Sequence, residues 1–207
     1  MNQRLNQRHL STRADAKSSP PALENVSKSR PLLADVEILR SRARTQIEQG
    51  AVTPGYAADR EAVVELLNKA LATEMVCVLR YKRHYFMAAG IHAASVAAEF
   101  LEHGNEEMRH ADLLAKRIVE LHGKPDFSPD GMSQRSYTEY VEGASLTAMI
   151  KEDLIAERIA IEGYRQMIGY LAGDDPTTQR LLKEILASEE EHAEDLSSLL
   201  EGMANQA

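Results

Sequence analysis

The chain has 207 residues, of which 43% are hydrophobic and 27% are charged, and its formal net charge is −8 at pH 7. This length and apolar content suit one domain with a sizeable core plus an extension. Because Cys77 is the single cysteine, the chain cannot form a disulfide framework or a cysteine-based zinc site of its own. A single cysteine is compatible with a reducing compartment, so we expect a cytoplasmic protein. No apolar run approaches the roughly 18–20 residues of a membrane span, so no membrane association is expected.

Residues 1–30 differ in composition from the rest of the chain. They contain six basic and two acidic residues, a net charge of +4, so the remainder carries −12. Polar residues and the Pro20-Pro21 pair dominate, a composition typical of a disordered tail. A solvated basic tail is the favoured interpretation. A contact with nucleic acid or another partner ranks second, and an organelle transit peptide ranks last because the stretch has no clear amphipathic face.

Residues 31–56 predict a short helix followed by a linker. Apolar residues at Val36, Leu39, Ala43 and Ile47 mark one face of a helix over residues 34–49. Glycine and proline directly after it predict its end. The sequence leaves open whether this helix packs on the rest of the domain or on a neighbouring subunit.

Residues 57–207 predict the main domain, with long helices at about 57–87, 94–122, 145–171 and 175–203. Each of the four has an apolar stripe with spacings of three and four residues. The connection at 123–144 is broken by glycine and proline and is long enough to cross from one end of a bundle to the other, with a helical turn expected near 136–141. The sequence therefore predicts an all-α four-helix bundle with a long crossover between the second and third helices.

Two Glu-x-x-His motifs, Glu107 with His110 and Glu189 with His192, interrupt the apolar stripes of the second and fourth helices. Residues three apart share a helix face, so carboxylate and imidazole can converge on one iron, manganese or zinc ion. One such match is expected by chance in a chain this rich in glutamate. His103 has no glutamate at this spacing and is expected to face solvent or a cavity.

The surroundings of the two motifs repeat as well. Glu74 precedes Tyr81 by seven residues, and Glu157 precedes Tyr164 by seven. Glu74 lies 33 residues before Glu107 of the first motif, and Glu157 lies 32 residues before Glu189 of the second. The midpoints of the two intervals fall at or beside the predicted turns, so the paired residues lie at the same height on two antiparallel helices. Packing the two hairpins together brings four glutamates and two histidines into one layer, a ligand set for a dinuclear metal site.

With these residues in place, the stretch from about 57 to 203 resembles the ferritin-like di-iron superfamily, and most closely bacterioferritin. The resemblance implies that Glu107 and Glu189 bridge the two metal ions. It implies that Glu74 and Glu157 are terminal carboxylate ligands and that His110 and His192 are the imidazole ligands. It implies a ferroxidase that binds two iron ions per chain, with manganese as an alternative, and oxidises Fe(II) with dioxygen or peroxide for iron storage or detoxification. It also implies a homo-oligomer, a catalytic role for Tyr81 beside the metals, and haem bound by Met108 between two subunits.

One departure from bacterioferritin concerns assembly. Bacterioferritin has a short fifth helix that helps to close a 24-subunit shell, whereas only four residues of this sequence follow residue 203. The resemblance therefore does not predict a cage of that kind, and the oligomeric state stays open.

Two other functions remain open from the sequence. Another di-metal enzyme, such as a peroxidase or a manganese catalase, would use the same ligand types, although a rubrerythrin-like four-cysteine iron domain is excluded by the cysteine count. A non-catalytic bundle that binds a partner or DNA through its basic tail is the second alternative. It predicts that deletion of residues 1–30 abolishes function while Glu107→Ala does not.

Overall fold

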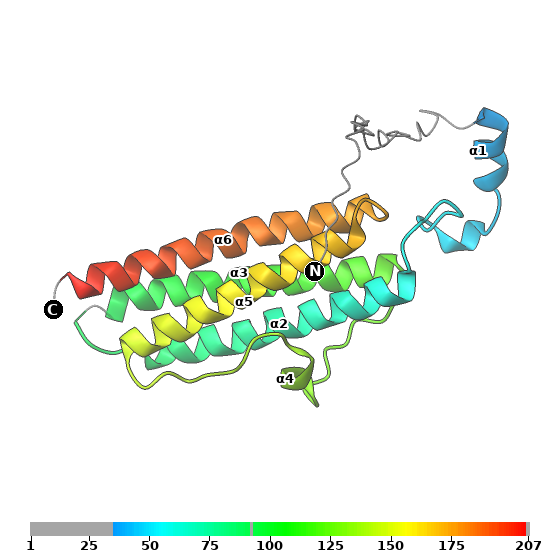
Figure 1. Cartoon of the computed structure of the whole chain (residues 1–207). Helices are drawn as coiled ribbons and strands as arrows, with labels where there is room; N and C mark the ends of the chain where they lie inside the picture. Colours follow the sequence, from blue (N-terminus) through cyan, green and yellow to red (C-terminus); the bar gives the residue numbers. More distant parts are fainter. Residues whose placement is uncertain (1–34, 92, 206–207) are drawn as a thin grey trace, which may run out of the picture.

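The computed structural model describes residues 35–91 and 93–205, in which every regular element is helical. Four long helices form the bundle: α2 (Arg60–Met87), α3 (Ala93–Glu120), α5 (Leu146–Leu171) and α6 (Pro176–Ala204). α2 packs along α3 and α5 along α6 as two hairpins, and the hairpins lie side by side (Figure 1). No helix in this part of the chain is long and apolar enough to cross a membrane. The predicted four-helix bundle is confirmed.

Side-chain caps determine where three of the long helices begin. Asp59, Ser145 and Asp175 precede α2, α5 and α6, and each accepts a hydrogen bond from a backbone N–H group two or three residues later. Such caps satisfy N–H groups that have no partner within the helix. Pro176 occupies the first turn of α6, where the missing N–H group costs nothing.

Two large apolar clusters make up most of the core of the described residues, and a small third cluster joins α2 to α4 (Met132–Arg135). Along α2, Val63, Leu67 and Leu71 belong to one large cluster, while Cys77 and Tyr81 belong to the other. All five side chains are at most 2% exposed. The four glutamates and two histidines predicted as metal ligands lie between the two large clusters, so apolar packing encloses them at both ends.

The connection between α3 and α5 runs along the bundle from one end to the other, as the sequence predicts (Figure 1). Its short helix is α4 (Met132–Arg135), and no helical turn forms at 136–141. The backbone there bonds to side chains of α2 instead. The Tyr137 N–H group donates to a threonine hydroxyl of α2 at 2.9 Å, and the Glu139 carbonyl accepts from Arg80 at 3.0 Å. Backbone groups engaged by another helix cannot close a local turn.

The segment before the bundle contains two short elements in place of the one helix predicted over 34–49. These are α1 (Val36–Arg42) and a 3-10 helix (Ile47–Gln49), and neither has a buried residue. α1 lies away from the bundle (Figure 1). The disordered basic tail predicted for residues 1–30 lies outside the described residues.

Candidate metal centre

The six residues predicted as metal ligands meet at one level in the middle of the bundle. They come from all four long helices: Glu74 from α2, Glu107 and His110 from α3, Glu157 from α5, and Glu189 and His192 from α6. Five of them are at most 1% exposed, and His110 is 7% exposed. The two hairpins bring them together because each turn lies midway between the glutamates that it pairs.

The six side chains form two groups of four that have two carboxylates in common. One group is Glu74, Glu107, His110 and Glu189; the other is Glu107, Glu157, Glu189 and His192. Within each group the ligand atoms lie within 4.8 Å of one another. His110 Nδ1 lies 3.3 Å from Glu74 Oε2 and 3.0 Å from Glu189 Oε1. His192 Nδ1 lies 3.6 Å from both Glu107 Oε1 and Glu189 Oε2.

Most polar atoms at this level lack a hydrogen-bond partner. In the part of the chain that the structure describes, nine buried side-chain nitrogen or oxygen atoms have none, and seven of these nine belong to the six ligands. Buried polar groups are normally hydrogen-bonded, so this concentration calls for a ligand. Four carboxylates and two neutral imidazoles carry a charge of −4, which two divalent cations would neutralise. The mixture of oxygen and imidazole donors also suits iron, so the residues fit two metal ions.

The pKa values of the metal-free site show the same conflict between its charges. Burial, followed by the charge of Glu107, raises the pKa of Glu74 to about 8. For His192, burial acts to lower the pKa, but contacts with Glu107 and Glu189 outweigh it and raise the pKa to about 12. The pKa of His110 is raised in the same way. Protons therefore hold the positions that cations would take, and metal binding would release them.

Two tyrosines link the hairpins at the metal layer. The Tyr81 hydroxyl of α2 donates to Glu157 of α5, and the Tyr164 hydroxyl of α5 donates to Glu74 of α2. Both tyrosines are at most 1% exposed. Gly104 of α3 allows the close approach at Tyr81, because a Cβ atom added there would lie only 3.0 Å from the Tyr81 Cβ. Glu74 and Glu157 are thus each oriented by a tyrosine of the other hairpin.

A further carboxylate orients one of the two histidines predicted as ligands. His192 Nε2 lies 2.8 Å from Glu106 Oε2, and Arg109 donates to the other oxygen of Glu106. Carboxylates that accept from the far nitrogen of a ligating imidazole fix its ring and tautomer. Glu106 therefore directs His192 Nδ1 towards the metal layer.

A buried ionic network anchors the crossover next to this layer. Arg80 donates to Asp153 at 2.7 Å, and His84 Nδ1 lies 2.7 Å from the other oxygen of Asp153. His84 Nε2 lies 3.1 Å from the Glu142 carbonyl of the crossover. All three side chains are at most 1% exposed, and Asp153 is one helical turn from Glu157. The network joins α2, α5 and the crossover beside a predicted ligand.

His103 is another residue at this site that sequence reasoning did not place there. It is 2% exposed, and its ring stacks on the ring of His192 with centroids 4.1 Å apart. Its Nδ1 atom lies 3.4 Å from the Tyr81 hydroxyl. Burial, followed by the charge of His192, lowers the pKa of His103 to about 4. Its position four residues before Glu107, on the same helix face, is a signal in the sequence that could have predicted this placement.

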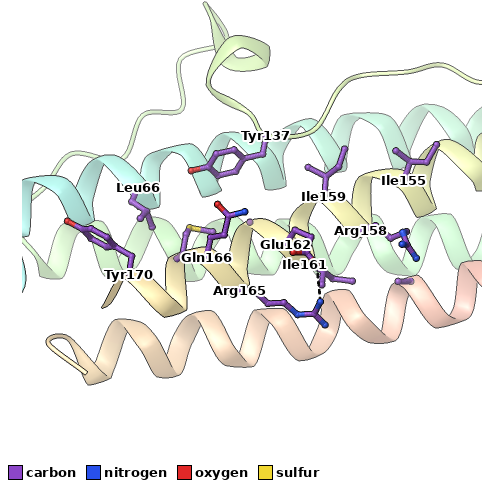
Figure 2. Close-up of a pocket in the computed structure, with 13 residues that line it drawn as sticks. Leu66, Tyr137, Ile155, Arg158, Ile159, Ile161, Glu162, Arg165, Gln166 and Tyr170 are labelled. Carbon is purple, nitrogen blue, oxygen red and sulfur yellow. Dashed lines mark hydrogen bonds and ion pairs between the residues drawn. The ribbon is translucent and has the colours of Figure 1, made fainter. Parts of the chain in front are cut away.

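Two surface features lie apart from the metal layer. Met108, predicted to bind haem, is 39% exposed on α3. A groove of about 890 Å³ follows α5 and is lined by Ile155, Ile159 and Tyr170 together with Tyr137 of the crossover (Figure 2). None of the six predicted metal ligands lines this groove, so it is separate from the metal centre.

Comparisons with known proteins show which family the helical domain belongs to. The ferritin-like domain model matches residues 64–205. The bacterioferritin of Desulfovibrio desulfuricans is 31% identical over 140 residues, which cover 67% of this chain and 74% of that protein. The bacterioferritin of Streptomyces coelicolor is also 31% identical over 140 residues, covering 67% of this chain and 80% of the relative.

Solved structures give the same result. The dodecameric thioferritin of Bacteroides fragilis, a bacterioferritin-related protein, superposes with a TM-score of 0.70 at 32% identity, covering 72% of this chain and 90% of that one. The bacterioferritin of Desulfovibrio desulfuricans, whose structure contains a di-iron site, has a TM-score of 0.63 at 26% identity, covering 70% and 82%. The chain belongs to the ferritin-like family, and residues 64–205 form its ferritin-like domain.

Proposed function

We propose that this protein binds two Fe(II) ions per chain between the four helices and oxidises them to Fe(III), in iron storage or detoxification. The observation that carries the proposal is the pair of four-residue groups joined by Glu107 and Glu189, in which buried ligand atoms lack hydrogen-bond partners. The bacterioferritin relatives, and the di-iron site of one solved relative, favour iron over other metals.

The two groups suggest a role for each side chain. The shared carboxylates of Glu107 and Glu189 would bridge the two ions. Glu74 with His110 would complete one ion, and Glu157 with His192 would complete the other. Carboxylate oxygens favour Fe(III), and the imidazoles keep the site able to bind Fe(II).

The reaction balances with iron as the electron donor. Each Fe(II) ion gives up one electron, and dioxygen takes two electrons and two protons to become hydrogen peroxide. With peroxide as the oxidant, two electrons and two protons convert it into two molecules of water. We assign Tyr81 to the oxidant side of the site, because its hydroxyl contacts both Glu157 and His103 and can hydrogen-bond an oxidant or pass on an electron.

The test compares iron binding and oxidation in the wild type with a Glu107→Gln/Glu189→Gln variant, which keeps the side-chain volumes but removes both shared charges. Anaerobic loading of the wild type should give at least two iron ions per chain, and admission of oxygen should produce Fe(III) absorbance. The variant should bind about two fewer iron ions per chain and lose the Fe(III) absorbance, whereas Glu194→Gln, at an exposed carboxylate of α6, should match the wild type. A wild type that takes up no iron would overturn the proposal.

The same preparations separate the alternatives. Manganese in the purified protein, with oxygen evolution from peroxide, would favour a manganese catalase. Deletion of residues 1–30 should leave iron oxidation intact. A loss of function on this deletion, with Glu107→Ala fully active, would favour a bundle that binds a partner or DNA through its tail.

We also propose that the chain forms a homo-oligomer and binds haem through Met108. The Bacteroides fragilis relative is dodecameric, and exposed apolar side chains such as Ile155 and Tyr170 offer contact area here. The exposed thioether of Met108 is accessible to a haem shared between two copies. Light scattering coupled to gel filtration tests the assembly, and a protein that elutes as a monomer at micromolar concentration would overturn both proposals.

A further inference from the structure

A second group of metal-binding side chains lies beside the candidate metal centre, between α3 and α6. Glu99 and His103 of α3 and Asp195 of α6 offer ligand atoms that lie within 4.8 Å of one another. Their side chains are 33%, 2% and 47% exposed, so a buried imidazole faces two carboxylates at the surface. None of the three belongs to the six ligands of the dinuclear site.

The hydrogen bonds around His103 show which of its nitrogen atoms is free. Tyr81 has one hydroxyl hydrogen and donates it to Glu157, so towards His103 the hydroxyl oxygen can only accept. His103 Nδ1, 3.4 Å from that oxygen, must therefore carry the ring hydrogen of the neutral imidazole. Nε2 then carries a lone pair and no hydrogen atom.

This lone pair points at two carboxylates, which are also acceptors. Nε2 lies 3.6 Å from Glu99 Oε1 and 3.7 Å from Asp195 Oδ2, beyond hydrogen-bond distance, and no other described group donates to it. Three acceptors facing one another repel unless a cation lies between them. Ligands of a tetrahedral ion with bonds of about 2.1 Å lie about 3.4 Å apart, so these distances need to close by only a few tenths of an ångström.

Solvent reaches the same place. A groove of about 340 Å³ is lined by Glu99, Asp195, Ser198 and Met203, among others. It opens at the two carboxylates, so a hydrated cation can arrive from solution and exchange part of its water for protein ligands. His103 Nε2 lies 3.6 and 3.7 Å from these two carboxylates, and the His103 ring stacks on that of His192 in the candidate dinuclear site.

We propose that Glu99, His103 and Asp195 form a third divalent-cation site for a first-row ion such as Fe(II) or Zn(II), completed by water from the groove. One imidazole and two carboxylates suit such ions and leave positions open for exchange. The site holds Fe(II) next to the dinuclear centre before the ion moves inward. That role as a waiting position depends on the proposed function, whereas the binding itself does not.

The experiment counts Zn(II) ions, which bind the same donors without oxidation. After dialysis against micromolar Zn(II), the wild type should retain about three ions per chain, and Glu99→Gln/Asp195→Asn should retain about two. The Glu107→Gln/Glu189→Gln variant should retain about one ion, and the control Glu194→Gln should match the wild type. Both carboxylates of the third site are partly exposed, so their replacement does not threaten the core.

Each outcome bears on one proposal. A wild type with about two ions, unchanged by Glu99→Gln/Asp195→Asn, overturns the third site and leaves the dinuclear centre standing. A third ion that survives this double substitution lies elsewhere and overturns it too. Equal counts in the wild type and in Glu107→Gln/Glu189→Gln would instead reject the dinuclear centre.

Anomalous diffraction at the zinc edge gives a second readout. The proposal expects a peak about 2.0–2.2 Å from His103 Nε2 in the wild type, and its loss in Glu99→Gln/Asp195→Asn. A crystal with peaks only at the dinuclear centre contradicts the third site.

Discussion

The buried carboxyl of Glu74 lowers the stability of the metal-free protein, because its pKa is higher in the folded state than in the unfolded chain. In the unfolded chain this group ionises with a pKa of 4.5, and folding raises the pKa to about 8. Above pH 4.5 the folded state must therefore hold a proton that the unfolded state gives up, and the resulting destabilisation grows until about pH 8. At pH 7 the difference of about 2.5 pH units corresponds to roughly 3 kcal/mol.

Glu74→Gln removes this cost, because an amide has no charge to lose in either state and still accepts a hydrogen bond from Tyr164. In EDTA at pH 7 we expect the variant to unfold with a free energy roughly 3 kcal/mol higher than the wild type, or roughly 6–12 °C higher in Tm. The difference should vanish near pH 4.5. Added Fe(II) or Zn(II) should reverse the order, because only the wild type keeps a charged ligand and gains stability from the bound ion.

The assay is urea unfolding followed by circular dichroism, from pH 4.5 to pH 8, at one protein concentration, with and without metal. Glu194→Gln is the matched control, since an exposed carboxylate should change stability by less than about 0.5 kcal/mol. A metal-free Glu74→Gln variant that is less stable than the wild type at pH 7 would refute the reasoning. An advantage that does not change with pH would refute the titration argument alone.

Four further predictions follow from the contacts described above. Zn(II) loading at pH 7 should release roughly three protons per chain into a weakly buffered indicator solution, because His110, His192 and Glu74 each hold a proton in the absence of metal. No release of protons would contradict this prediction. Asp153→Asn leaves the buried guanidinium of Arg80 without its carboxylate and should lower the free energy of unfolding by about 3 kcal/mol or more. The control Glu142→Gln, at an exposed ion pair, should change the free energy of unfolding by less than about 1 kcal/mol. Similar losses in the two variants would contradict this prediction. Tyr81→Phe should slow Fe(II) oxidation without changing the iron count, and an unchanged rate would remove Tyr81 from the reaction. Tyr81→Phe and Tyr164→Phe should each lower the free energy of unfolding by about 1–3 kcal/mol, since each leaves a buried carboxylate oxygen without its donor. Haem reconstitution should give a Soret band that Met108→Leu abolishes at an unchanged iron count, and a wild type without this band would end the haem hypothesis.

Local periodicity explains why the bundle could be predicted from the sequence. Helical stripes repeat every three or four residues, and the caps and breakers between them are local, so the four helices and the crossover follow from nearby residues. The candidate ligands were predicted for the same reason, because the two residues of a Glu-x-x-His motif lie on one face of one helix. Glu74 and Glu107 are equally far from the turn between their helices, which predicts that they lie at the same height in the hairpin. Burial of these carboxylates on apolar stripes then pointed to a metal.

Only the tertiary structure decided the contacts between hairpins, because no sequence interval encodes the register of α2 against α5. That register pairs Tyr81 with Glu157 and Tyr164 with Glu74, and it brings Arg80 to Asp153, so that the crossover binds α2 in place of forming its own helical turn. The third group of ligands has the same origin. His103 and Asp195 are 92 residues apart in the sequence and meet only because α3 lies against α6, and the free nitrogen of His103 is determined by a tyrosine on another helix.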